Sequence, residues 1–202
     1  MSVTFAFTLV ASLFPQTVGL WFSHPVVSFF SITGLIIGTI LLICYPQYRK
    51  NVPINYILLL LVTVCVSCAV ASIGAQSDPL DVLLAMFGTT FASVGLYFAA
   101  LHTKQNVNLV FNMIIGLCIA SVVHLITVLC LFSIFGIQST TTTLVSSVLL
   151  CLIFGGFIMV DFFMILVPGT VDKDDYIMAA LNLYCDIVRL FVRLLIILAS
   201  KK

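Results

Sequence analysis

The sequence contains no glutamate, and charged residues make up only 7% of it. A soluble globular domain has about 25% charged residues, so an ordinary water-exposed surface is excluded. The formal net charge is +1, which gives no surplus of either sign to attract nucleic acid or another polyanion. Hydrophobic residues reach 62% instead. The composition therefore predicts an integral membrane protein surrounded by the lipid bilayer.

Long polar segments are also missing, so there is no room for a separate soluble domain. The pieces between the apolar runs are short, such as "SHP", "QSDPLD" and "PGTVDKDD". An apolar run of about 20 residues crosses roughly 30 Å of hydrocarbon as a helix. We therefore expect one all-α domain over residues 1–202, a polytopic bundle of seven transmembrane helices. The predicted spans are 3–22, 25–45, 56–75, 82–101, 109–132, 144–166 and 176–199.

The first run lacks the features of a removable signal peptide. No lysine or arginine precedes it, and no small-residue cleavage site stands before a polar mature segment. We therefore expect it to remain as a spanning helix, with a kink at Pro15.

Positive charges in the connections predict the orientation, because short cytosolic loops are enriched in lysine and arginine. The second, fourth and sixth connections carry such charges, whereas the third carries only acids. The N-terminus is therefore predicted to be cytosolic. Lys201 and Lys202 would then lie on the opposite side, so it stays open whether the last segment crosses fully. The basic residues of the second, fourth and sixth connections are Arg49, Lys50, His102, Lys104 and Lys173, and the acids of the third connection are Asp78 and Asp81.

None of the connections contains a cysteine, which argues against a disulfide framework. All seven cysteines fall inside predicted spans or at their ends. Cys65 and Cys68 form a CxxC, but they lie in a continuous apolar run without a second pair of ligands. We interpret them as packing residues.

Two aspartates lie inside apolar runs, where a lone ionised carboxylate costs at least ~2.5 kcal/mol. They are Asp161 in "GGFIMVDFFMILVP" and Asp186 in "LYCDIVRLFVRLL". A short connection joins their segments, which predicts antiparallel neighbours with the acids about 10 Å and about 16 Å into the membrane. Modest tilt would bring them within hydrogen-bond reach. We predict a pair that shares one proton and, when deprotonated, offers oxygen ligands to calcium.

Arg189 and Arg193 follow Asp186 at i+3 and i+7, on the same side of the helix. One interpretation is an internal ion pair between Asp186 and Arg189, with Arg193 reaching toward the membrane surface or a carbonyl. Such a pair would keep Asp186 ionised, and Arg189 would act as a latch that must move before calcium binds. His124, midway along the fifth run, is a candidate for a proton path or a simple interhelical bond.

Three stretches in the last third of the chain form a pattern. They are "GFIMVD" ending at Asp161, the acidic pair before Tyr176, and "YIMAALNLYCDI" from Tyr176 to Ile187. The pattern resembles the transmembrane Bax inhibitor motif family, in its Golgi anti-apoptotic and lifeguard-like branch. The layout of seven runs extends this resemblance over the whole chain. Large viruses carry relatives of this family, and the lack of a hydrophilic tail before the first run would suit a viral member.

The resemblance implies a seven-helix fold with a central last helix and an aspartate pair, at Asp161 and Asp186, that gates a pH-sensitive calcium leak. It implies residence in the endoplasmic reticulum or Golgi membrane, and a role in limiting apoptosis. Calcium would be the transported ion, no cofactor is implied, and the partners would be membrane proteins of calcium or apoptosis pathways. Four features depart from the family. The third span has no acid, Val160 stands where many relatives have tyrosine, Phe162 where a small polar residue is common, and Arg189 where asparagine is usual.

Two other functions stay open. The chain could be a non-conducting membrane protein that binds apoptosis or calcium-handling partners, with the acid and arginine only structural. An intramembrane aspartyl protease also needs two aspartates on neighbouring helices. Its Tyr-Asp and Gly-x-Gly-Asp motifs are absent, because Asp161 follows Val160 and Asp186 follows Cys185. We therefore expect no enzymatic activity.

Overall fold

The described part of the chain is helical. The computed structural model describes residues 1–102, 115, 119, 122, 126, 140–166 and 176–200. These residues form helices and turns and no strand, which confirms the all-α fold class. Most of the expected fifth span, 109–132, lies outside the described residues, and so does His124.

The chain divides into two compact units. Unit 1 comprises residues 1–86 and 171–184, and unit 2 comprises residues 87–170 and 185–202. The chain passes from one unit to the other within α6 (Pro79–His102) and again within α9 (Tyr176–Ala199). The single domain expected over 1–202 stays a prediction.

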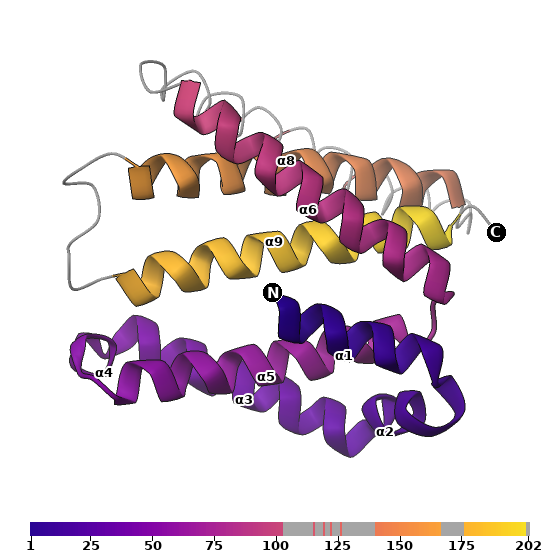
Figure 1. Cartoon of the computed structure of the whole chain (residues 1–202), viewed down its shortest axis with the longest axis horizontal. Coiled ribbons are helices and arrows are strands. Elements are labelled where there is room, and N and C mark those ends of the chain that lie inside the picture. The colour runs from indigo at the N-terminus through magenta and orange to yellow at the C-terminus, as the bar shows by residue number, and fades with distance from the viewer. Residues whose placement is uncertain are drawn as a thin grey trace. The chain divides into compact units, whose positions relative to one another are not determined.

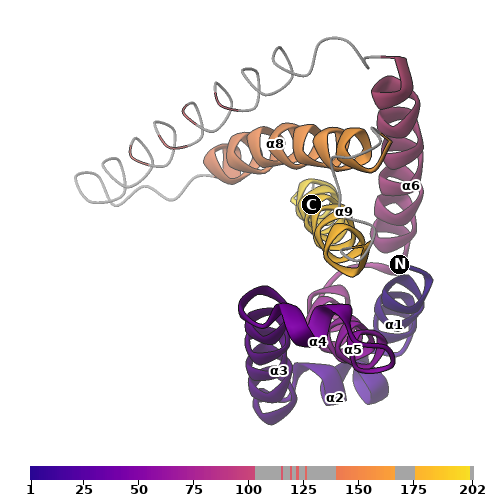
Figure 2. The same ribbon diagram turned by 90° about the vertical axis from the view of Figure 1, so that its left-hand side faces the viewer.

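In unit 1, α1 (Ser2–Leu13) and α3 (Pro25–Cys44) both pack on α5 (Ile54–Gly74), as Figure 1 and Figure 2 show. Prolines mark where these helices start. Pro25 is the first residue of α3, and α5 begins directly after Pro53. Proline suits the first turn, because its missing N–H would have no helical partner there. The short helix α4 (Pro46–Lys50) lies in the connection between α3 and α5.

The first apolar run is sharply bent. Helix α1 ends at Leu13, and a π-helix η1 (Pro15–Gly19) and the short α2 (Leu20–Ser23) follow it. The two parts meet at 106°. Pro15 cannot continue the hydrogen bonding of α1, and its ring disfavours a helical residue before it. The run expected over 3–22 is thus a broken span or a re-entrant loop, and its break lies at Pro15, where the kink is expected. The side of the N-terminus stays a prediction.

Small and hydroxyl-bearing residues form the contact between α1 and α5. Thr4, Thr8 and Ser12 are buried at every fourth position of α1. Thr8 lies against Gly74, where a Cβ would overlap its methyl group. Thr4 Oγ1 lies 3.0 Å from Ser67 Oγ and 2.8 Å from the Tyr184 hydroxyl. Close approach through small residues and interhelical hydrogen bonds is how helices associate in membranes.

Unit 2 is built from the later part of α6, α8 (Thr140–Leu166) and the later part of α9. Figure 1 shows α8 and α9 side by side, running in opposite directions. Phe162 of α8 meets Tyr97 of α6 edge to face, with ring centroids 5.3 Å apart. Gly155 of α8 lies against Leu96, which also belongs to α6.

Several described helices are suited to cross a membrane. Among the described residues, four helices are long and apolar enough to cross a membrane: α3, α5, α6 and α8. The bent N-terminal pair would make a fifth span if its two parts are counted as one. Helix α9 has 24 residues but carries three charges, Asp186, Arg189 and Arg193. The chain is therefore a polytopic helical membrane protein in contact with lipid.

Candidate functional site

Asp186 lies on the buried side of α9. Only 8% of this residue is exposed, and the apolar Leu190, one turn further along the helix on the same side, is buried as well. The charged residues of α9 recur at spacings of three and four residues, so Asp186, Arg189 and Arg193 lie on one side of the helix. A carboxylate in such a position needs a partner, because burial of an unpaired charge is costly.

Arg189 is that partner. Its Nη1 donates to Asp186 Oδ1 at 2.7 Å, one turn along α9. The side chain of Asp186 is 12% exposed, whereas that of Arg189 is 58% exposed. The guanidinium of Arg189 also lies over the ring of Phe154 on α8, 5.8 Å from its centroid. This cation–π contact ties the ion pair of α9 to α8.

Asp161 of α8 differs, because one of its two oxygens lacks a partner in the described part of the chain. Its Oδ2 is buried and makes no hydrogen bond, and it is the one buried side-chain oxygen or nitrogen in this state among the described residues. The carboxyl group of Asp186 is near enough to act on Asp161 electrostatically. Cys185 lies close to both acids. The structure therefore brings the two predicted aspartates into one charged cluster.

Arg193 lies further along the same face. Its charge acts on Cys151 of α8. Three interacting pairs thus follow one another along the antiparallel helices: Asp161 and Asp186 by charge, Phe154 and Arg189 by a cation–π contact, and Cys151 and Arg193 by charge. The contact between α8 and α9 is acidic at one end and basic at the other.

Sequence reasoning missed Phe154 and Cys151 as parts of this contact. Phe154 lies two turns before Asp161 on α8, and Cys151 lies a further turn away. Spacings of three and seven residues place all three on one side of a helix, so the signal was present. Their neighbours on α9 could not be known before the register of the two helices was known.

Two carboxyl groups alone make an incomplete calcium site. Calcium takes 6–8 oxygen ligands. Within residues 1–102, 140–166 and 176–200, no group of three or more histidine, cysteine or acidic side chains could hold a metal ion. An ion at Asp161 and Asp186 would need water or other groups for most of its coordination.

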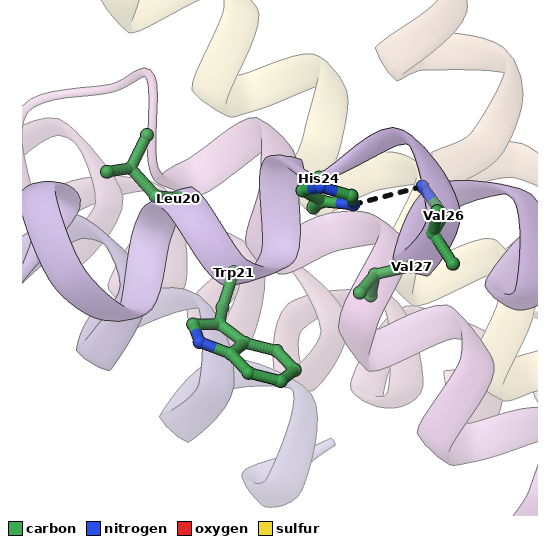
Figure 3. A pocket seen from close by; sticks show the side chains of 5 residues that line it. All are labelled: Leu20, Trp21, His24, Val26 and Val27. Carbon is green, nitrogen blue, oxygen red and sulfur yellow. Dashed lines mark hydrogen bonds between the residues drawn. The ribbon is translucent and has the colours of Figure 1, made fainter.

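A separate recess lies at the turn between α2 and α3 in unit 1. Figure 3 shows its lining, and its volume is about 440 Å³. His24 accepts a hydrogen bond from the Val26 amide at 3.4 Å and so caps α3. The described lining contains no acid. The lining residues are Leu20, Trp21, His24, Val26 and Val27.

The fold and the site together define a polytopic helical membrane protein with a pair of acids on antiparallel neighbouring helices. The sequence model of the family Bax1-I, described as inhibitor of apoptosis-promoting Bax1, matches residues 1–202. The chain belongs to this family, which confirms the resemblance found in its last third.

Individual relatives agree with this assignment. The chain is 30% identical to the Golgi anti-apoptotic protein of Vaccinia virus (strain Lister) over 168 residues, which is 83% of this chain and 65% of that protein. It is also 30% identical to Protein lifeguard 4 of Mus musculus over 159 residues, 77% of this chain and 62% of the relative. The matched part thus spans slightly less than two thirds of these relatives. No solved structure matches the chain.

Proposed function

We propose that the chain is a pH-sensitive calcium leak of Golgi or endoplasmic reticulum membranes that limits apoptosis. The observation that carries this proposal is the buried, unpartnered Oδ2 of Asp161 beside Asp186. An unsatisfied polar atom costs about 1–3 kcal/mol. Such a cost is expected where a proton or cation must bind and leave. The Golgi location and the anti-apoptotic role are supported by the name of the viral relative.

The ion pair of Asp186 and Arg189 supplies a latch. While Asp186 is ionised it holds the guanidinium at 2.7 Å, and the positive charge stays beside the acids, where it repels calcium. A proton shared between Asp161 and Asp186 weakens the hold on Arg189, because a neutral carboxyl group attracts a guanidinium far less than a carboxylate does. The acid pair with one proton still has a net charge of −1. Acidification is therefore expected to release the latch and increase the leak.

Calcium efflux from liposomes that contain the purified full chain tests this proposal. We expect efflux to increase as the pH is lowered from about 8 to about 5, across the range in which carboxyl groups in pairs and apolar sites take up protons. Asp161→Asn and Asp186→Asn should each give a rate that is nearly independent of pH. Arg189→Asn should leak at pH 8 at a rate close to that of the wild type at pH 5.

Asp81→Asn is the matched control, because it makes the same chemical change in the first turn of α6, outside the charged cluster. It should keep the wild-type pH profile. If Asp161→Asn and Asp186→Asn also keep that profile, the acid pair has no gating role and the proposal fails.

A second function is favoured by one observation, the close ion pair itself. With Asp186 held by Arg189, the chain could act as a non-conducting protein that binds partners of calcium or apoptosis pathways. Absence of efflux from wild type and Arg189→Asn alike, together with protection of cells from apoptosis by both, would favour that function. Cleavage of a transmembrane peptide that is lost in both aspartate variants would instead identify a protease.

A further inference from the structure

The end of α9 is rich in positive charge. From Arg189 to the last residue the chain has four cations, Arg189, Arg193, Lys201 and Lys202, and no acid follows Asp186. Asp186 neutralises only Arg189. A positive cluster at one end of a membrane helix attracts anionic lipid headgroups, at about 1 kcal/mol per cation near the surface.

Arg193 has donors left for such a headgroup. In the part of the chain that the structure describes, it forms no hydrogen bond or ion pair, and its charge acts on the thiol of Cys151. An arginine in an apolar helix must find a partner for its five N–H donors. Cys151 is a weak acceptor and cannot satisfy a guanidinium.

The depth of Arg193 suits contact with a phosphate. A helix of 24 residues is about 36 Å long, slightly more than the roughly 30 Å of hydrocarbon. Arg193 is six residues before Ala199, about 9 Å from the helix end. A long arginine side chain can extend from this depth to the headgroup region.

Arg189 can contribute to the same site. It lies four residues deeper, about 6 Å along the axis, on the same face. More than half of its side chain is exposed, and only its Nη1 is recorded in a hydrogen bond. Two guanidinium groups one turn apart can hold one phosphate between them, since each presents a planar fork to phosphate oxygens.

We propose that Arg193, with Arg189, binds the phosphate of an anionic phospholipid at the C-terminal end of α9. A bound phosphate competes with Asp186 for Arg189 and so favours release of the latch. This last consequence rests on the proposed calcium leak, whereas the lipid site itself does not. Anionic lipid would then increase the leak at pH 8, where Asp186 otherwise holds Arg189.

Native mass spectrometry of the full chain in detergent tests the site, with phosphatidylglycerol titrated against phosphatidylcholine. We expect Arg193→Gln to weaken binding of phosphatidylglycerol about tenfold, the effect of losing one charge-assisted contact of roughly 1.4 kcal/mol. Arg189→Gln should weaken it less, because that side chain is shared with Asp186. Arg193→Lys should fall between wild type and Arg193→Gln, because lysine keeps the charge but loses the fork.

Lys50→Gln is the matched control, since it removes one cation from the exposed helix α4. It should leave binding unchanged. Equal lipid binding by wild type and Arg193→Gln, or equal weakening by Lys50→Gln, would overturn the lipid site. Displacement of the lipid by millimolar inorganic phosphate would also overturn it, since the site would then recognise a free anion.

The two proposals can fail separately. Efflux at pH 8 is compared in liposomes with and without phosphatidylglycerol, for wild type and Arg193→Gln. Loss of lipid binding in Arg193→Gln without efflux from any variant supports the lipid site and contradicts the leak. A pH-dependent leak that the aspartate variants abolish, with lipid binding unaffected by Arg193→Gln, supports the leak and contradicts the lipid site.

Discussion

The hydroxyl cluster of unit 1 and the charged cluster of unit 2 both place polar side chains in apolar helices, but their hydrogen bonding differs. The hydroxyl cluster consists of Thr4, Ser67 and Tyr184, which are neutral and bonded to one another through Thr4 Oγ1. Ser67 also donates to the Thr63 carbonyl at 2.7 Å. The charged cluster consists of Asp161, Asp186 and Arg189, and it leaves Asp161 Oδ2 buried without a partner.

This difference suggests different roles: the hydroxyl cluster holds helices together, and the charged cluster takes part in the proposed leak. Hydroxyl groups that satisfy one another hold helices together at little cost and have no proton to exchange near neutral pH. An acid with an unsatisfied oxygen destabilises the fold, as expected of a residue that takes part in the proposed leak rather than in packing. Substitutions in the hydroxyl cluster should therefore change stability alone. Substitutions in the charged cluster should change the pH response.

The largest effect on stability is expected from Gly74→Ala. The new Cβ would overlap the Thr8 methyl group and lie 3.1 Å from the Thr8 carbonyl oxygen. Thr8 cannot turn away freely, because its hydroxyl donates to the Thr4 carbonyl at 2.7 Å. We expect a loss of about 2 to 3 kcal/mol, the usual cost of overpacking. Thermal unfolding in detergent measures the loss.

Gly95→Ala makes the same change on α6, where no described atom lies within 4 Å of the new Cβ. It should be neutral or slightly stabilising, because alanine favours helices over glycine. Equal destabilisation by both variants would mean that the close contact of α1 with α5 does not determine the result. A changed pH profile of efflux in Gly74→Ala would mean that the contact of α1 with α5 affects the pH response as well as stability.

The bounds of the helices could be predicted well where length and apolarity determine them. The run predicted at 176–199 coincides with α9, and the run predicted at 25–45 ends one residue beyond α3. Prolines fix the starts of α3 and α6, since proline is tolerated only in the first turn. These signals are local, so one sequence is enough to find them.

The break in the first run and the state of the acids could not be predicted to the same degree. Pro15 predicts a kink, but the bend of 106° also depends on the helices against which η1 and α2 pack. The pairing of Asp186 with Arg189 follows from their spacing, whereas the burial of Asp161 Oδ2 depends on the register of α8 against α9. Register is a tertiary property that periodicity does not contain.

Asp161→Leu should sharpen the comparison, because it should increase stability while it removes function. Leucine is branched at Cγ as aspartate is, and it leaves no oxygen unsatisfied. We expect a gain of about 1 to 2 kcal/mol in the free energy of unfolding, close to the cost of a buried unsatisfied polar group. Thermal unfolding at pH 8 measures the gain, and liposome efflux should show no pH response. A loss of stability would mean that Asp161 is a structural residue, as the hydroxyl cluster is.

The smallest effect is expected within the hydroxyl cluster, from Thr4→Val and Tyr184→Phe. Each variant removes one partner of the 2.8 Å contact between Thr4 Oγ1 and the Tyr184 hydroxyl. A double-mutant cycle should give a coupling of about 0.6 kcal/mol, the average for hydrogen bonds between membrane helices. Thermal unfolding of the two single variants and the double variant measures this coupling, and the pH profile of efflux should stay that of wild type in all three. If the profile shifts instead, the hydroxyl cluster takes part in gating, and the separation of a structural unit 1 from a titrating unit 2 is wrong.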